Sequence, residues 1–336
     1  MNYREEANAS KKNKQAYLAG LERLIRERQQ EAAEKRSAYF QNIPQNGARF
    51  REDLREMLGW PLVGYTPAGL PAVKAERLAE ERGYTVYRLE LEVLEGLTLS
   101  GLYFERQGGA HPLVLVQHGG LGTPELIAGL YGSTANYNDM LERVIAQGVH
   151  AFAPQLVLWD KSYDVPFERA HLDGALKRVG SSIAAVELFA LMRVLDHFEV
   201  QENVSSLGMV GMSYGGFYTL YLAALDTRIR AAVSCAFFNT RDAYPWPDWT
   251  WHRSAEKFDD AEVACLVWPR KLCIEIAEGD PLFAAESGKR SFERLTALCE
   301  ASGMGTDWVR LVPFAGNHEF CKDDAPLAAL AEALRA

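Results

Sequence analysis

Hydrophobic and polar positions alternate along the segment that begins near residue 84. The stretch YTVYRLELEVLE places apolar residues at nearly every second position, and a second strand-like run, LTLSGLYFER, follows after Glu95-Gly96. This period of two predicts a pair of half-buried strands joined by a tight turn, which favours an antiparallel hairpin. The next apolar run, PLVLVQ (112–117), is short and continuous. Such a run is typical of a central strand with both faces buried.

Downstream of this run, helical and strand-like segments alternate to the end of the sequence. Alternation of this kind, opened by an antiparallel hairpin, predicts an α/β fold with one mostly parallel sheet and helices on both faces, forming a single domain over 80–336. The expected elements are helix 137–147, strand 149–153, helix 182–198, strand 206–211, helix 216–225, strand 230–236, an irregular stretch 237–268, strand 271–277, helix 285–301, strand 308–313 and helix 325–335.

The first 79 residues predict a helical arm. Nine Lys or Arg and six Glu are interleaved over the first 40 residues, and a second helical piece, ARFREDLREMLGW, follows. We expect the arm to pack on the main domain or to cap its site; a contact between two copies of the chain, giving a homodimer, is the alternative. The apolar residues at helical spacing are Tyr17, Leu18, Leu21, Leu24 and Ile25.

The composition of the chain limits the classes of protein to which it can belong. The formal charge of the 336 residues is −9, which disfavours a nucleic-acid partner because phosphate binding relies on clustered Lys and Arg. No apolar stretch approaches the length of a membrane span, and the first residues lack the apolar core of a signal peptide, so we expect a cytoplasmic protein. Five cysteines without CxxC spacing are interpreted as reduced thiols.

The segment SLGMVGMSYGGFYTLYLAAL (206–225) joins a predicted strand to a predicted helix through the pattern G-x-S-x-G, in which Ser213 lies between Gly211 and Gly215. The serine of such a turn has strained backbone angles, and the flanking positions must be nearly free of side chain to avoid clashes. The turn exposes the hydroxyl above a helix N-terminus, whose amides stabilise negative charge. Ser213 is therefore the predicted nucleophile.

A serine hydroxyl needs a base that is held by a third group, and in this kind of site the chain order is Ser, acid, His. His318 follows the last predicted strand on a Gly-containing loop, whereas His252 lies in an aromatic-rich stretch with no strand end before it, so His318 is the predicted base. The acid is expected after strand 271–277. Asp280, which precedes a turn-forming proline, is favoured over Glu278.

The oxyanion hole requires two N–H donors. The amide of Tyr214, at the helix N-terminus, is the first, and the loop QHGGLGTPE after strand 112–117 supplies the second, from Gly120 or Leu121. This loop lacks the spacing of a phosphate-binding motif, and His118 at its start is interpreted as a structural hydrogen-bonding residue. The other histidines show no metal-ligand spacing, so no metal or cofactor is expected.

Aromatic residues are concentrated in FFNTRDAYPWPDWTW (237–251), between a predicted strand and the predicted acid. Trp246, Trp249 and Trp251 are candidates for lining a substrate pocket, because flat rings pack well against sugars and aromatic esters. The alternative is a hydrophobic plug that packs on the core.

With these residues placed, the chain resembles the α/β-hydrolases, and within them the dienelactone hydrolase and acetyl xylan esterase branch. The matching pieces are VLVQHGGLG, GMSYGGFYTLYLAALDTRIRAAVS, AEVACLVWPRKLCIEIAEGDPLF and PFAGNHEF, which span about 110–320 in the order found in the family. The resemblance implies that Ser213 is the nucleophile, Asp280 the acid and His318 the base. Dienelactone hydrolases use a cysteine where this chain has the serine.

The expected activity is that of a serine carboxylesterase acting through an acyl-enzyme. Thioesterase and peptidase activities would use the same triad, and a non-catalytic binding protein with this fold is the alternative from a different class. A peptidase of the prolyl-oligopeptidase type would need a large additional domain, for which only about 110 residues precede the first central strand.

Overall fold

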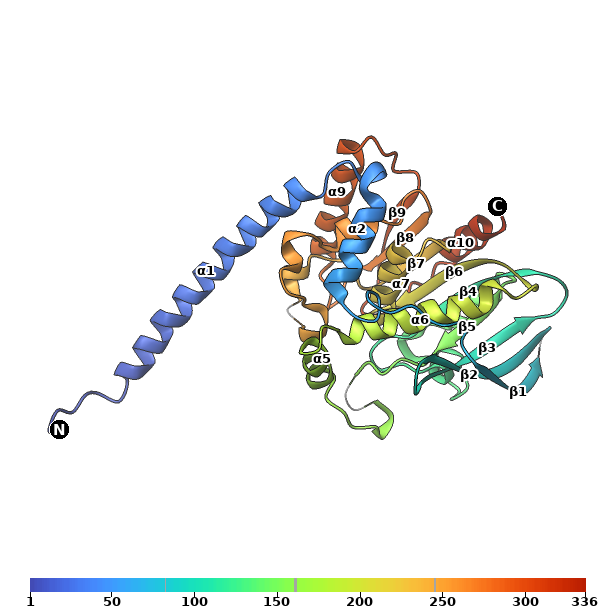
Figure 1. Ribbon diagram of the computed structural model, residues 1–336, viewed down its shortest axis with the longest axis horizontal. Coiled ribbons are helices and arrows are strands. Elements are labelled where there is room, and N and C mark those ends of the chain that lie inside the picture. The colour runs from blue at the N-terminus through green and yellow to red at the C-terminus, as the bar shows by residue number, and fades with distance from the viewer. Residues whose placement is uncertain (82, 160–161, 245) are drawn as a thin grey trace.

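A computed structural model describes residues 1–81, 83–159, 162–244 and 246–336. Within these residues one sheet runs in the order β1-β2-β3-β5-β4-β6-β7-β8-β9 (Figure 1). The strands from β5 through β4 to β9 are parallel, and the remaining pairs are antiparallel, which confirms the predicted α/β architecture. The strands are β1 (Val73–Glu81), β2 (Tyr84–Leu94), β3 (Leu97–Arg106), β4 (His111–Gln117), β5 (His150–Pro154), β6 (Val204–Met212), β7 (Ile229–Cys235), β8 (Lys271–Ala277) and β9 (Val309–Phe314).

Helices cover both faces of this sheet. Leu113 and Leu115 of β4 belong to the core formed with α6 and α7, whereas Val114 and Val116 belong to the core formed with α4 and α10. Burial on both faces explains why β4 is continuously apolar. The helices are α1 (Ala9–Tyr39), α2 (Ile43–Leu58), α3 (Pro124–Ile127), α4 (Met140–Ile145), α5 (Arg169–Lys177), α6 (Ile183–Glu199), α7 (Tyr214–Leu225), α8 (Asp260–Cys265), α9 (Ala285–Ala301) and α10 (Ala325–Arg335).

The second half of the chain agrees closely with the predicted elements: β8, α9 and α10 have the expected bounds. The stretch expected to be irregular, 237–268, contains α8 and several short 3-10 helices. Their brevity explains why periodicity did not reveal them, since a helix of one or two turns contains too few apolar repeats.

The sheet begins at Val73, before the boundary predicted at residue 80. The difference arises because the sequence pattern did not predict β1. This strand lies at the edge of the sheet beside β2, and all its residues are exposed or half-buried. An edge strand of this kind has no alternation of buried and exposed residues, and the charged residues of VKAERLAEE suit an exposed edge.

Helix α1 projects from the body of the molecule, with the N-terminus at its far end (Figure 1). Its buried residues are Ala32 and Arg36, both near its C-terminal end. Arg36 donates a hydrogen bond of 2.6 Å to the carbonyl oxygen of Ala255 and pairs with Asp259 and Glu262. The C-terminal end of α1, here called its base, is thus attached to the body of the molecule, and the preceding turns extend away from the body.

Helix α2 packs against the C-terminal ends of two other helices. Arg51 donates hydrogen bonds to the carbonyl oxygens of Ala224 at 3.0 Å and Leu266 at 2.8 Å, and Arg55 donates one to Leu225 at 2.7 Å. The last carbonyls of a helix lack intrahelical partners and carry partial negative charge, which a guanidinium offsets. The two arginines therefore attach α2 to the ends of α7 and α8.

We predict that Arg51→Met lowers the free energy of unfolding by about 1–3 kcal/mol, because two carbonyl groups lose their donor in a partly buried place. Urea denaturation of the variant and the parent chain measures the change. Arg23→Met, at an exposed position of α1, is the control and should leave the stability nearly unchanged. Equal stability of the Arg51 variant and the control would contradict this account of α2.

Candidate active site

The turn between β6 and α7 has the backbone geometry that its sequence predicted. Ser213 has φ 60° and ψ −121°, a positive φ that is uncommon for a residue with a side chain. A Cβ at Gly211 would lie 2.2 Å from the carbonyl oxygen of Gly215, and one at Gly215 would lie 2.1 Å from that of Gln117. Neither contact is possible, so both glycines are required for the turn that presents Ser213 at the carboxyl edge of the sheet.

His318 and Asp280 meet at the same edge, after β9 and β8. His318 Nδ1 lies 2.8 Å from Asp280 Oδ2, and Asp280 Oδ1 accepts hydrogen bonds from the amides of Leu282 and Phe283 at 2.8 and 3.0 Å. Both carboxylate oxygens therefore have partners, which fixes the orientation of the acid toward the ring. Glu278, the other candidate acid, lies at the surface within 3.8 Å of Lys289.

The loop that carries His318 is held beside the end of β7. The side-chain amide of Asn136 donates to the carbonyl oxygen of His318 at 2.8 Å, and the carbonyl oxygen of Glu319 lies 3.6 Å from Cys235 Sγ. The amide of Ser213 donates to the carbonyl oxygen of the same Cys235 at 2.9 Å. The serine and the histidine loop thus both contact the last residue of β7. No pattern in the sequence had indicated the role of Asn136.

The glycine loop after β4 lies against the serine. A Cβ at Gly119 would come within 3.1 Å of Ser213 Cβ, and the amide of Gly119 donates to the hydroxyl of Tyr137 at 2.9 Å. At Gly120 a Cβ would meet the ring of Trp159 at 2.5 Å, and the Leu121 side chain is 59% exposed. The loop therefore approaches the serine closely with little side-chain bulk.

His118 is a buried structural residue, in agreement with the interpretation from the sequence. Its Nδ1 lies 2.8 Å from the carbonyl oxygen of Gly119, and its Nε2 accepts a hydrogen bond of 3.2 Å from the amide of Leu156. This pattern requires a neutral ring with its proton on Nδ1. Burial lowers the pKa of His118 to about 4, so the ring keeps this form at neutral pH.

A buried network of charged groups surrounds the side chain of Tyr214. Its hydroxyl donates to Asp248 Oδ2 at 3.1 Å, and Arg169 donates to the same oxygen at 2.8 Å. Arg169 also pairs with Glu187 at 2.7 Å and bonds the hydroxyl of Tyr218 at 2.8 Å. Burial and the nearby Asp248 raise the pKa of Tyr214, so its phenol remains a donor. The sequence did not predict this network, whose members have no common motif.

The three candidate pocket tryptophans lie in different environments. Trp249 and Trp251 are buried, and both stack on Phe217, with ring centroids 5.2 and 6.4 Å apart. Their positions fit the hydrophobic plug that was the alternative interpretation. Trp246 is only partly buried and stacks on the ring of Tyr214 at 5.8 Å.

Phe283 lies between Trp246 and the predicted base. The ring of Trp246 is 6.0 Å from that of Phe283, which in turn stacks on His318 at 5.6 Å. Tyr214, Trp246 and Phe283 therefore form an aromatic wall that runs from the residue after the serine to the imidazole.

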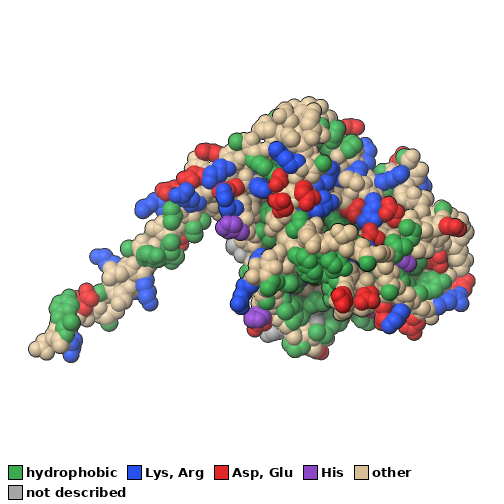
Figure 2. Space-filling view, in the orientation of Figure 1, with side chains coloured by type: hydrophobic (Ala, Val, Ile, Leu, Met, Phe, Trp, Pro, Cys, Tyr) green, Lys and Arg blue, Asp and Glu red, His purple; other side chains and the backbone are tan. Residues whose placement is uncertain are grey.

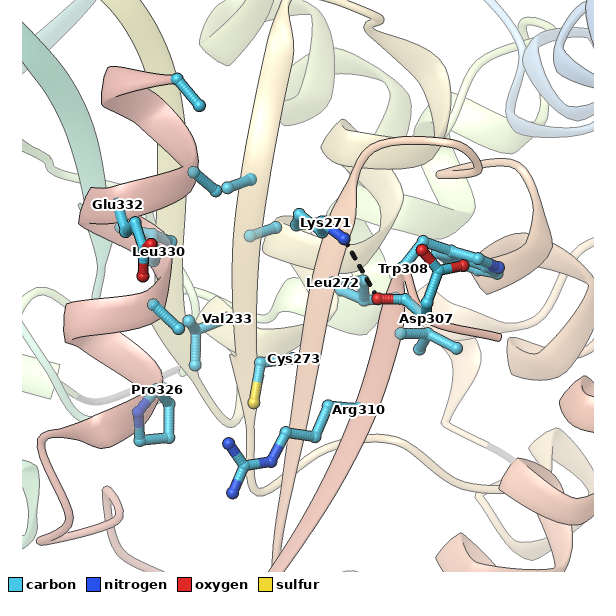
Figure 3. A pocket seen from close by; sticks show the side chains of 16 residues that line it. Val233, Lys271, Leu272, Cys273, Asp307, Trp308, Arg310, Pro326, Leu330 and Glu332 are labelled. Atoms are coloured by element: carbon cyan, nitrogen blue, oxygen red, sulfur yellow. Dashed lines mark hydrogen bonds between the residues drawn. The ribbon is translucent and has the colours of Figure 1, made fainter. Parts of the chain in front are cut away.

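A cavity of about 450 Å³ opens elsewhere, between α10 and strands β7 to β9 (Figure 3). Its lining includes Ala231, Lys271 and Val309, which stand at the amino-terminal starts of these three strands. Because Ser213, Asp280 and His318 follow the carboxyl ends of their strands, this cavity lies at the opposite edge of the sheet from these three residues.

The described part of the chain contains no helix with an apolar run long enough to cross a bilayer. Among the same residues, His, Cys, Asp and Glu side chains form no group of three that could hold a metal ion.

Comparison with known proteins decides the family. The model of the dienelactone hydrolase family matches residues 126–295, half of the sequence, including the serine turn and Asp280. The chain belongs to the dienelactone hydrolase family. A lactone is a cyclic ester, so the predicted enzyme class, a carboxylic ester hydrolase, is confirmed at the level of the family.

Individual relatives agree with this assignment. A protein of Bacillus subtilis (strain 168) named as a hydrolase, YtaP, is 26% identical over 80% of this chain and 94% of its own length. A glucuronoyl esterase from Solibacter usitatus superposes with a TM-score of 0.65 at 16% identity, covering 86% of this dienelactone hydrolase family member and 92% of that chain. A structure from Bacteroides fragilis NCTC 9343, described as an acetyl xylan esterase, gives 0.64 at 17% identity, with coverages of 84% and 79%. These structures share the fold.

We predict that His118 makes this hydrolase less stable as the pH falls from about 6.5 to about 4. The unfolded imidazole binds a proton near pH 6.5 and the folded one only near pH 4, so acid favours the unfolded chain by up to about 3 kcal/mol. Urea denaturation at several pH values should show a smaller slope for His118→Gln than for the parent chain.

The control is His252→Gln, at an exposed position, which should keep the parental slope. Burial raises the pKa of Glu275 to about 7, which acts in the opposite direction in all three proteins and cancels in the comparison. Parallel stability curves for the His118 variant and the parent chain would contradict the prediction.

Proposed function

We propose that this family member is a serine carboxylesterase whose catalytic triad is Ser213, His318 and Asp280. The observation that carries the proposal is the 2.8 Å contact between His318 Nδ1 and Asp280 Oδ2, at the edge where Ser213 occupies its strained turn. A carboxylate bonded to Nδ1 orients the ring so that Nε2 can accept a proton from a serine. Among the described residues, no hydrogen bond joins Ser213 Oγ to His318 Nε2. We propose that these two atoms come into contact during the reaction.

In the proposed reaction, Ser213 Oγ attacks the carbonyl carbon of the ester while His318 takes the hydroxyl proton. The tetrahedral intermediate collapses, the C–O bond to the alcohol breaks, and His318 returns the proton to the leaving oxygen. Water then loses a proton to His318 and attacks the acyl carbon, the bond from that carbon to Ser213 Oγ breaks, and His318 returns the proton to Oγ, which releases the acid and restores the serine. Asp280 remains ionised throughout and stabilises the imidazolium.

The oxyanion of the intermediate would be bound by the amide of Tyr214 and by an amide of the glycine loop. The proposed second donor is the amide of Gly120 or Leu121; the amide of Gly119 donates to the hydroxyl of Tyr137. The close approach of this loop to Ser213 supports its participation. A donor of this kind contributes about 10²–10³-fold in rate.

We propose further that the aromatic wall binds the substrate, with Trp246 as its exposed part. The ring of Trp246 is only partly buried, whereas Trp249 behind it is fully enclosed. A flat aromatic surface suits a sugar or an aromatic ring, and two of the structural neighbours are named as esterases of carbohydrate substrates. Esters with one such component are therefore the proposed substrate class.

The triad is tested with Ser213→Ala. We expect the variant to lose at least about 10³-fold in kcat/KM toward p-nitrophenyl acetate, because no other group supplies the nucleophile. A fluorophosphonate probe should label the parent chain and fail to label the variant. Turnover by the variant at nearly the parental rate would refute the proposal.

Matched pairs of variants test the acid and the base. Asp280→Asn should lose about 10⁴-fold in kcat by analogy with other triads, while Glu278→Gln keeps its activity. His318→Gln should be inactive, while His252→Gln stays active. Equal losses within either pair would show that the 2.8 Å contact is structural rather than catalytic.

For the aromatic wall, we predict that Trp246→Ala raises KM for esters with a sugar or aromatic component by about 10-fold, with little change in kcat/KM for ethyl acetate, which has no ring. Trp249→Ala should instead lower the free energy of unfolding by about 3–5 kcal/mol, because its ring fills the core. Steady-state kinetics on an ester series, together with urea denaturation, separates the two effects. A uniform loss of activity for all esters in the Trp246 variant would contradict its role in binding.

A further inference from the structure

Five large apolar side chains lie exposed on the projecting part of α1. Tyr17, Leu18, Leu21, Leu24 and Ile25 are between 39 and 73% exposed, and Figure 2 shows apolar atoms along this helix away from the body. At 100° per residue these side chains lie within one face of the helix, here called the α1 stripe. Apolar residues at one helical face are normally covered, and none of the described parts of the chain covers the α1 stripe.

The α1 stripe is symmetric about its centre. Counting outward from Leu21, apolar residues occur three and four positions away in both directions: Leu18 and Tyr17 on one side, Leu24 and Ile25 on the other. A stripe of this kind keeps its pattern when the helix direction is reversed. It is therefore complementary to itself in an antiparallel pair, as a two-fold interface requires.

We propose that a second copy of this chain docks on the α1 stripe, with the two α1 helices antiparallel and crossing at Leu21. In this arrangement the two Leu21 side chains meet at the two-fold axis. On the sides of the helices that face each other, Tyr17 lies against Leu24 of the second copy and Leu18 against Ile25. Each chain thus covers the other's exposed apolar residues.

The charges along α1 favour this orientation over a parallel one. Lys11, Lys12 and Lys14 lie in the first turns, where the helix has no acidic residue. The base instead has both signs of charge, with Glu31 and Glu34 among Arg28, Lys35 and Arg36. At the base, Gln29 also bonds Asp242 of the body at 3.1 Å. An antiparallel pair keeps the two lysine clusters apart, while a parallel pair would bring them together.

The dimensions of the molecule permit this pairing. The eleven residues from Leu21 to Ala32, where α1 first becomes buried, span about 16 Å, so the two bodies stand about 33 Å apart along the helix pair. The exposed fractions of the α1 stripe correspond to roughly 1,000 Å² over both chains, near the lower limit for a specific interface. We therefore expect a reversible dimer whose population depends on concentration.

A membrane surface is the other occupant that an exposed helical stripe can bind. Helices that lie on membranes have Lys and Arg on the polar face. After Lys14 the polar positions of α1 instead have both signs of charge, with Glu22, Glu27, Glu31 and Glu34 interleaved with Lys and Arg. This composition favours the second copy, and vesicle binding becomes one outcome of the test.

Sedimentation velocity on the full chain over a range of concentrations tests the proposal. The parent chain should show a monomer–dimer equilibrium, and Leu21→Asp should weaken it at least about 100-fold because two charges would meet at the axis. The control is Leu172→Asp, another exposed leucine on a helix, which should dimerise like the parent. A parent chain that is monomeric at all concentrations, or one that sediments with anionic lipid vesicles while staying monomeric in their absence, would overturn the proposal.

Disulfide cross-linking tests the orientation and remains informative if an aspartate disturbs the helix. Under mild oxidation Leu21→Cys should form a covalent dimer, while Ala19→Cys on the opposite face and the parent chain should not. A mixture of size-tagged Tyr17→Cys and Leu24→Cys chains should give the mixed dimer. Cross-linking of each of these two variants to itself alone would indicate a parallel pair and contradict the proposed geometry.

Discussion

A steric constraint at the start of α7 determines where the site lies. A Cβ at Gly215 would lie 2.1 Å from the carbonyl oxygen of Gln117, and one at Gly216 would lie 2.6 Å from that of Cys235. The first turn of α7 therefore contacts the ends of β4 and β7, the strands on either side of β6. Packing this close fixes the helix against the sheet, and with it the direction in which Ser213 points. The glycine loop after β4 packs against Ser213, and the loop of His318 contacts Cys235, to which the amide of Ser213 also donates.

The constraint at the turn and the parallel order of the strands explain how much the sequence could predict. The pattern around Ser213 is local, and its two glycines are required by contacts that any strand–turn–helix junction of this type makes. Asp280 and His318 follow neighbouring parallel strands, whose carboxyl ends lie at one edge. Identifying β8 and β9 was therefore enough to bring the acid and the base together, although 38 residues separate them.

Other features depend on contacts that no local pattern reveals. Arg169 and Tyr214 come from α5 and α7; both bond Asp248, which lies in a short 3-10 helix, and the Arg169 guanidinium lies over the Tyr214 ring at 5.3 Å. A buried charge is tolerated when its partners are present, but nothing in the separate segments shows that they will meet. β1 was not predicted for a different reason. As an exposed edge strand it has no buried face, so its sequence does not alternate between apolar and polar residues.

Tyr214 belongs both to the serine turn, which the sequence predicted, and to the buried charge network, which it did not. Its backbone begins α7, so the amide has a place fixed by the predicted turn, while its ring stacks on Trp246 and its hydroxyl bonds Asp248. Because the ring and the amide belong to one residue, a shift of the buried charge network would move the aromatic wall and disturb the start of α7 together. The proposed substrate surroundings are thus connected to the serine turn through one residue, and a substitution at Tyr214 that shifts the first turn of α7 would affect both the aromatic wall and the proposed oxyanion donor.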